Sequence, residues 1–276
     1  MKMLVMARFT FREALQKRVL HGVLVLTVAF LALFTLGVWL AFREIVPRDQ
    51  SGTLARMIGL QFTLLGMNVV SMIGALLAVF LSVGTISSEV DSGTLHAIVP
   101  KPLRRRDVLW GKWLGFAAML AVYVFALSLA TGGAVALFSG HWLDKMVVAA
   151  LLLVLQSLLL LSISILGTTF LPTVANGVVV FGLYAAAMVS GFVEQLGTLI
   201  RNESMVNVGI VTSLLVPSDA MGKLAAAVLQ EGASYFERAG PFMVNSQPSI
   251  WMVAYTLLYV AVLLVVAERV FAARDL

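Results

Sequence analysis

Hydrophobic residues run along this chain in long unbroken stretches, and shorter polar segments separate them. Six stretches approach or exceed the roughly 20 residues that an α-helix needs to cross about 30 Å of hydrocarbon. They cover residues 21–42, 62–86, 113–138, 146–170, 177–193 and 250–270. Because the runs are continuous rather than alternating, they predict membrane-spanning helices and not the strands of a barrel. The pattern predicts an all-α integral membrane protein with one transmembrane domain over residues 1–276.

The composition supports a membrane location. Hydrophobic residues make up 61% of the chain and charged residues 12%, and the mean hydropathy is +0.99. A soluble domain is about half apolar and about a quarter charged. The absence of cysteine from the sequence excludes disulfides and thiolate metal sites. A net charge of +5 fits the basic flanks of a membrane protein, so we expect no nucleic-acid partner.

The distribution of Lys and Arg predicts the orientation in the membrane. If the N-terminus is cytoplasmic, twelve of the 19 basic residues fall on the cytoplasmic side. They are Lys2, Arg8, Arg12, Lys17, Arg18, Lys101, Arg104, Arg105, Arg106, Lys112, Arg269 and Arg274. Basic residues concentrate in the cytoplasmic flanks of membrane helices, so we expect both termini in the cytoplasm.

The segment before the first span, residues 1–20, has the spacing of an amphipathic helix. Its apolar side chains recur at helical intervals at Leu4, Ala7, Phe11 and Leu15. Such a helix lies in the membrane interface, with its apolar side toward the lipid. We therefore expect an interfacial helix here; the alternative is an ordinary charged flank before a span.

The segment between the fifth and sixth spans, residues 194–249, mixes apolar runs with Pro217, Pro241 and Pro248. We expect it to lie outside the cell as short helices along the outer membrane surface. Glu194 and Glu203 flank the outer mouth in this interpretation and look like ordinary loop acids.

A compact polar block, residues 87–112, separates the second and third spans. Ser92 and Gly93 can end the second helix, because Gly accepts the left-handed backbone that follows a helix end. Pro100 and Pro102 keep the intervening "TLHAIV" from joining the next helix. Asp107 suits the positive first turn of that helix. The block is a short cytoplasmic element held between two spanning helices, so it can pass a push from a soluble partner to both.

These residues resemble a known family. The string Glu89, Ser92-Gly93-Thr94-Leu95, Lys101-Pro102, Arg105-Arg106 and Gly111-Lys112 is similar to the block between the second and third helices of ABC-2 type exporter permeases. The stretch "FREALQKR" (Phe11–Arg18) resembles the family's N-terminal connecting helix. The stretch "LLVPSDAMGKLA" (Leu214–Ala225) is similar to the branch that includes the nitrous-oxide reductase maturation permease. The resemblance implies the ABC-2 (type V) exporter fold, with six transmembrane helices and an N-terminal interfacial helix.

The resemblance also implies partners and sites. It implies a homodimeric membrane half of an exporter in a prokaryotic cytoplasmic membrane, with two separate ABC ATPase subunits that carry ATP and Mg²⁺. The 87–112 block would be the coupling-helix loop that rests in a groove of the ATPase. The implied contact residues are Glu89, Ser92, Gly93, Thr94, Leu95 and Arg105. The implied membrane-anchor or interface residues are Arg12, Arg104, Arg106 and Lys112. The alternatives are headgroup anchoring for the arginines and a solvated helix end for Glu89.

The sequence offers no catalytic or cofactor site of its own. The G-x-x-x-x-G-K-[ST] phosphate-binding motif does not occur in it, so ATP hydrolysis by that route belongs to another polypeptide. His21, His96 and His141 are too far apart in sequence to suggest a metal site. The spans carry almost no ionisable groups. Asn68 and Gln156 are candidates for lining a transport path, and the alternative is hydrogen bonding between helices.

The leading hypothesis is the permease subunit of an ABC transporter, non-catalytic itself, that exports an amphipathic or hydrophobic substrate. One alternative is a membrane mechanotransmitter or scaffold that relays ATPase motion to an extracytoplasmic partner protein. A third hypothesis is an ATP-independent channel or secondary carrier, against which the scarcity of intramembrane charge argues.

Overall fold

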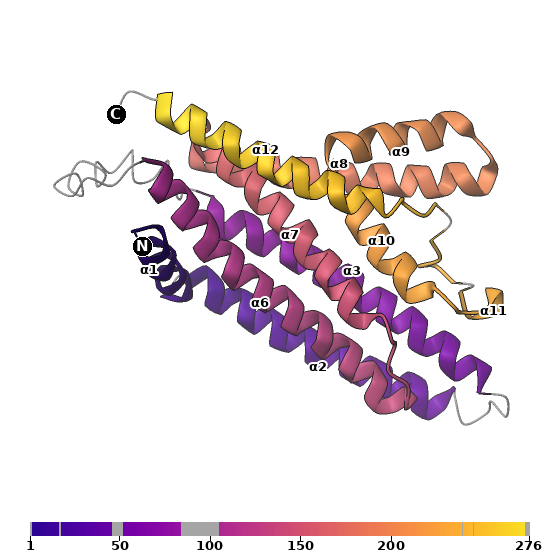
Figure 1. Cartoon of the computed structure of the whole chain (residues 1–276). Helices are drawn as coiled ribbons and strands as arrows, with labels where there is room; N and C mark the ends of the chain where they lie inside the picture. Colours follow the sequence, from indigo (N-terminus) through magenta and orange to yellow (C-terminus); the bar gives the residue numbers. More distant parts are fainter. Residues whose placement is uncertain are drawn as a thin grey trace.

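The computed structural model of the protein describes residues 2–16, 18–45, 52–83, 105–238, 240–244 and 246–273. These residues form a bundle of α-helices (Figure 1). The helices are α1 (Lys2–Gln16), α2 (Arg18–Glu44), α3 (Thr53–Ser82), α6 (Arg105–Ser139), α7 (Met146–Thr168), α8 (Thr173–Ile200), α9 (Glu203–Leu215), α10 (Ser218–Gln230), α11 (Tyr235–Arg238) and α12 (Trp251–Ala273).

Six helices are long and apolar enough to cross a membrane: α2, α3, α6, α7, α8 and α12. This confirms the six predicted spans. Most of the helices extend beyond the predicted apolar stretches, because polar flanking residues continue the helix after the hydrophobic run has ended. The fifth helix extends at both ends, since it begins at Thr173 and continues to Ile200, where the hydrophobic pattern predicts 177–193.

Local sequence explains where several helices begin and end. Pro172 directly precedes α8, where its missing N–H is not needed. Arg201 takes a left-handed conformation at the end of α8 (φ 56°). Asn202 then caps α9 by accepting a hydrogen bond from the Met205 N–H (3.3 Å). Two residues therefore reverse the chain, and α9 returns antiparallel beside α8 (Figure 1).

The centre of the bundle is formed by α3, α6 and α7. In the most apolar 18-residue stretch of α7, 67% of the residues are buried inside the protein, whereas only 17% are buried in the corresponding stretch of α2. Close backbone approach holds the three central helices together. A Cβ on Gly66 of α3 would lie 2.2 Å from Thr131 of α6, and one on Gly74 of α3 would lie 2.7 Å from the hydroxyl of Ser157 on α7. Glycine at these positions lets the helices pack closely.

The pair α9 and α10 does not lie across the end of the bundle. The two helices meet at 109° around Val216 and Pro217. Helix α9 packs along α8, and α10 packs against α7. Short helices are present in this segment as expected. Their place along the outer membrane surface stays a prediction. The pair also begins after Ile200, so residue 194 belongs to α8.

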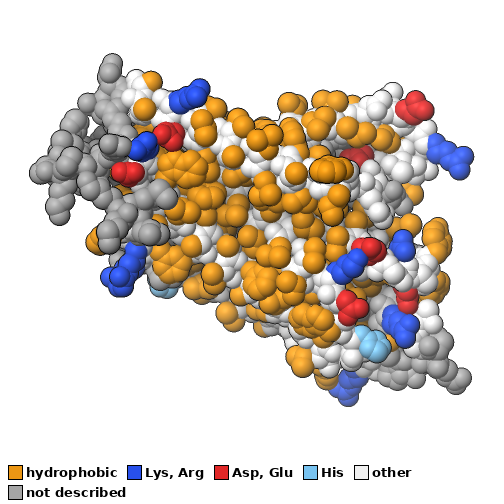
Figure 2. Space-filling view, in the orientation of Figure 1, with side chains coloured by type: hydrophobic (Ala, Val, Ile, Leu, Met, Phe, Trp, Pro, Cys, Tyr) orange, Lys and Arg blue, Asp and Glu red, His pale blue; other side chains and the backbone are white. Residues whose placement is uncertain are grey.

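The surface divides into an apolar belt and two charged ends. Figure 2 shows hydrophobic side chains over the middle of one face and Lys, Arg, Asp and Glu near both ends. We call the end that carries both chain termini, the end of α3 and the start of α6 the terminal end, and the end that carries α11 the opposite end (Figure 1). The belt has the apolar surface that a helix bundle presents to lipid.

Candidate functional site

The predicted coupling loop connects α3 and α6 in the sequence. Its ATPase-contact residues Glu89, Ser92, Gly93, Thr94 and Leu95 lie outside the described residues, as does Arg104. On either side, α3 ends at Ser82 and α6 begins at Arg105. The first turn of α6 contains Asp107 as expected, where a carboxylate interacts favourably with the positive end of the helix.

Helix α1 is fixed to α6 by a close contact. A Cβ on Gly115 of α6 would lie 2.7 Å from the Ala7 carbonyl oxygen and 2.8 Å from Thr10 Cβ. Thr10 is 2% exposed, so this is the inner face of α1. Arg12 is exposed. Within the segment 1–20, where an interfacial helix is expected, α1 covers Lys2–Gln16, and protein covers its inner face. Its location in the membrane interface stays a prediction.

The start of α6 is also tied to α12 and α7. The Trp110 indole N–H donates to Glu268 Oε2 on α12 (2.9 Å), and that of Trp113 donates to the Ser162 hydroxyl on α7 (2.9 Å). Lys112, between them, is only 2% exposed, whereas Arg106 is exposed. The basic residues predicted as one anchoring group therefore lie in different environments, one inside the protein and others on its surface.

The two path-lining candidates meet at the same cavity. Gln156 of α7 is 3% exposed, and its amide N–H₂ donates to the Ser71 hydroxyl on α3 (2.8 Å). Ser71 also lies 3.5 Å from the Tyr184 hydroxyl on α8. Asn68 is exposed and donates to the Leu64 carbonyl of its own helix (2.9 Å). All four polar side chains line a cavity of about 140 Å³.

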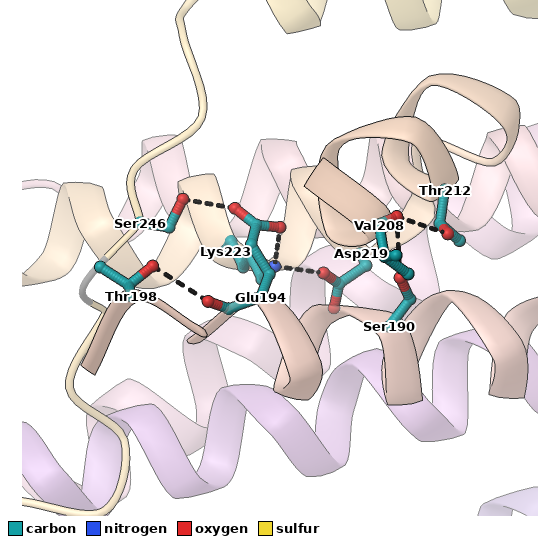
Figure 3. Close-up of polar contacts among 8 residues, drawn as sticks. All are labelled: Ser190, Glu194, Thr198, Val208, Thr212, Asp219, Lys223 and Ser246. Atoms are coloured by element: carbon teal, nitrogen blue, oxygen red, sulfur yellow. Dashed lines mark hydrogen bonds and ion pairs between the residues drawn. The ribbon is translucent and has the colours of Figure 1, made fainter. Parts of the chain in front are cut away.

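Next to this cavity lies a buried ionic cluster, drawn in Figure 3. The Lys223 ammonium of α10 donates to Glu194 Oε2 of α8 (2.7 Å) and lies 2.9 Å from Asp219 Oδ2, one turn earlier in α10. The Ser246 hydroxyl donates to Glu194 Oε1. The Lys223 and Glu194 side chains are only 5% and 7% exposed. Charges so buried require partners, and each of the two has one.

Glycines make room for this cluster. A Cβ on Gly191 of α8 would lie 2.1 Å from Asp219 Oδ2, and one on Gly209 of α9 would lie 2.4 Å from Glu194 Cβ. Both helices can approach the acidic side chains only because these positions lack a side chain. The polar contacts continue along the hairpin, where the Ser190 hydroxyl donates to the Val208 carbonyl (3.5 Å).

The cluster corrects two expectations. Glu194 is not a loop acid: it lies in α8 and is buried. The statement that the spans carry almost no ionisable groups misses this residue and the basic partner that α10 brings to it. The available signal was the i, i+4 pair of Asp219 and Lys223 within a short segment of otherwise small or apolar residues, which predicts a buried pair more than a solvated loop.

The comparison with known proteins decides the family. The family model described as "ABC-2 family transporter protein" matches residues 4–276, nearly the whole chain. The chain belongs to the ABC-2 transporter family. The match includes the terminal end, the central helices and the buried cluster, so the family resemblance noted in the polar block extends over the entire fold. A search of curated proteins found no match.

Membership of the ABC-2 family makes this chain a permease subunit, a multi-pass membrane protein that partners an ABC ATPase subunit. Such subunits are generally non-catalytic. Within the described ranges, no three His, Asp or Glu side chains gather where they could hold a metal ion. The narrower resemblance to the nitrous-oxide reductase maturation branch stays a prediction.

Proposed function

We propose that two copies of this ABC-2 permease form a translocation path and export an amphipathic or hydrophobic substrate. Separate ATPase subunits, which bind ATP and Mg²⁺, drive the movement by pushing on the 87–112 loop at the terminal end. The observation that carries this proposal is that the helices flanking the loop, α3 and α6, are also the close-packed centre of the bundle.

Tight packing supports the transmission of such a push. Protein interiors are close-packed and transmit displacement rather than absorb it. Helix α6 contacts α1 at Gly115, α3 at Thr131 and α7 at Gly132, where a Cβ would lie 2.5 Å from Met146. These contacts extend over much of the length of α6, so a movement of its first turn displaces its neighbours together with it.

The nature of the exposed surface supports the cargo class. The outward faces of α2, α8 and α12 carry apolar side chains, for example Val25 (70% exposed), Val178 (67%) and Leu258 (64%). Among the described residues, the cavity around Gln156 brings polar side chains of α3, α7, α8 and α10 together. A path bordered by such helices suits a molecule with a large apolar part better than it suits a small ion.

Placing an arginine in the loop tests this function. The full chain is reconstituted in liposomes with its ATPase subunits, and efflux of a tail-labelled fluorescent dodecylammonium is measured per ATP hydrolysed. We expect Glu89→Arg or Gly93→Arg to reduce this ratio at least about tenfold while membrane insertion is kept. Glu44→Arg, an exposed reversal at the opposite end, is the matched control. Unchanged efflux and hydrolysis in the two loop variants would contradict the proposal.

A second candidate is a mechanotransmitter that relays ATPase motion to an extracytoplasmic protein. It is favoured by an open hollow of about 490 Å³ at the opposite end, with the charged side chains Arg56, Asp144, Glu231 and Glu237 in its lining. In the same liposomes, ATPase stimulation by the amphiphile supports transport. Stimulation only by an added outer protein supports the second candidate.

A further inference from the structure

The cavity around Gln156 is a polar space deep within the bundle. Ser71, Gln156 and Tyr184 each lie about ten or more residues from both ends of their helices, which is a depth of about 15 Å at 1.5 Å per residue. Helix α10 closes the cavity from a further side with Ser218, Asp219, Gly222 and Lys223. Ionisable residues this deep in a membrane protein commonly mark a substrate or ion pathway.

Several buried oxygen atoms in its lining have no hydrogen-bond partner among the described residues. They are Gln156 Oε1, Ser218 Oγ and Asp219 Oδ2. Asp219 Oδ2 does have an ionic partner, the Lys223 ammonium at 2.9 Å, so Gln156 Oε1 and Ser218 Oγ are the two atoms with neither kind of partner. Leaving such groups unsatisfied is costly. A ligand that donates hydrogen bonds can satisfy them.

The formal charge of the ionic cluster favours a positively charged ligand. Glu194 and Asp219 carry two negative charges and Lys223 carries one positive charge, so the cluster keeps one uncompensated negative charge in a buried place. Both oxygens of Glu194 are already occupied, one by Lys223 and one by Ser246. The remaining accepting capacity therefore belongs to Asp219, which borders the cavity.

The cavity opens between α3 and α8. Its lining includes the exposed side chains of Asn68 on α3 and of Met188 and Phe192 on α8, which are 41% and 57% exposed. An amphipathic molecule can thus place a small polar head inside and keep its apolar tail along Met188 and Phe192. The volume of about 140 Å³ accommodates a few water molecules or one ammonium group with its first methylenes.

We propose that this cavity binds the primary ammonium head of an amphipathic molecule, through Gln156 Oε1, Ser218 and the Asp219 carboxylate. Only the role of this molecule as transport cargo rests on the proposed function. Binding itself is a property of the purified chain. The ammonium can belong to a free long-chain amine or to the headgroup of an aminophospholipid, since both present the same N–H donors.

The test measures equilibrium binding of three probes to the full chain in phosphatidylcholine nanodiscs, with empty nanodiscs subtracted. Dodecylammonium carries charge and N–H donors, dodecyltrimethylammonium carries only the charge, and dodecanol carries neither the charge nor an N–H. We expect dodecylammonium to bind about tenfold more tightly than the trimethyl compound. Nanodiscs that contain phosphatidylethanolamine distinguish the two sources. If this lipid competes with dodecylammonium, the ligand is a lipid headgroup. If it does not compete, the ligand is a free amine.

Three variants locate the binding. Gln156→Leu removes one acceptor, and Asp219→Asn removes the charge while leaving Lys223 paired with Glu194. Gly222→Val fills the cavity, because its Cβ lies 3.4 Å from Gln156 Oε1. We expect each to weaken dodecylammonium binding about tenfold. The control Asp144→Asn, an exposed acid at the opposite end, keeps wild-type binding.

Two results would overturn the inference: equal binding of the ammonium and trimethyl probes, or wild-type affinity in those of the three variants that remain folded. Because Gln156 lies on α7, apart from the ion pair, its variant remains informative if Asp219→Asn misfolds. Binding failure with intact ATP-driven transport rejects this site alone. Intact binding without ATP-driven efflux rejects the proposed function and leaves the site.

Discussion

The surface of the terminal end and the buried cluster beside α8 place their charged residues in different environments. At the terminal end Arg12 and Arg106 are exposed, where water or a partner surface can reach them. Towards the opposite end Lys223 and Glu194 are buried against each other and fix the α9–α10 pair to α8. Exposed charges contribute little to stability and suit contacts that form and break. Buried charges require their partners, so they make one arrangement of helices far more favourable than others.

Removing the buried cation tests this difference most severely. In Lys223→Met, Glu194 and Asp219 face each other without a counter-charge. We expect a loss of about 3–5 kcal/mol in the free energy of unfolding, because breaking a buried pair leaves an uncompensated charge. The measurement is the unfolding of the purified chain in nanodiscs followed by tryptophan fluorescence.

The matched control for that change is Lys145→Met. Lys145 pairs with Glu231, but the two side chains are 46% and 62% exposed. We expect a change of at most about 1 kcal/mol. If Lys223→Met and Lys145→Met lose the same free energy of unfolding, burial does not make the Lys223 ion pair more important for stability than the Lys145 pair.

Replacing a glycine under the cluster is the next largest effect. In Gly191→Ala, the new Cβ would lie 2.1 Å from Asp219 Oδ2, so α10 must move away from α8. We expect a loss of about 1–3 kcal/mol, the usual cost of overpacking. On the same helix, Gly182→Ala meets nothing within 4 Å and is expected to be neutral or slightly stabilising. If the two variants unfold at the same midpoint, close approach at Gly191 is not what fixes α10.

Apart from the control variants, the smallest effect is expected at the terminal end. Trp110→Phe removes the hydrogen bond to Glu268 (2.9 Å) but keeps most of the aromatic packing. Because Glu268 is only partly buried, water can take over the lost bond. We expect a loss of about 1 kcal/mol in unfolding free energy, measured as above. A loss as large as that in Lys223→Met would contradict the contrast between the terminal end and the buried cluster.

Much of the fold follows from hydrophobic runs. Each of the six long helices coincides with a run long enough to cross the hydrocarbon. Helix α1 was predictable from its amphipathic spacing. The break at Val216 and Pro217 was visible as a proline between apolar segments, but the 109° angle was not. That angle depends on which neighbours cover α9 and α10, and no local pattern contains this information.

For the candidate site, the sequence identified Asn68 and Gln156 because amides are conspicuous within apolar helices. It did not identify Tyr184 or Ser218 as their companions in one cavity. Glu194 was predicted to lie in a loop because the hydrophobic run weakens before α8 ends. Hydropathy indicates where a helix leaves the lipid, and a helix can continue beyond that point.

The amino-acid sequence by itself determined that this chain is a six-span helical membrane protein with a charged loop between its second and third spans, because the cost of placing polar groups in hydrocarbon acts on each segment separately. Only the tertiary structure decided that Glu194, Asp219 and Lys223 meet inside the bundle. Their contact requires a reversal after Ile200, a second bend at Pro217, and the side-chain-free surfaces of Gly191 and Gly209. Those conditions couple segments far apart in the chain, and the packing of the whole bundle satisfies them together.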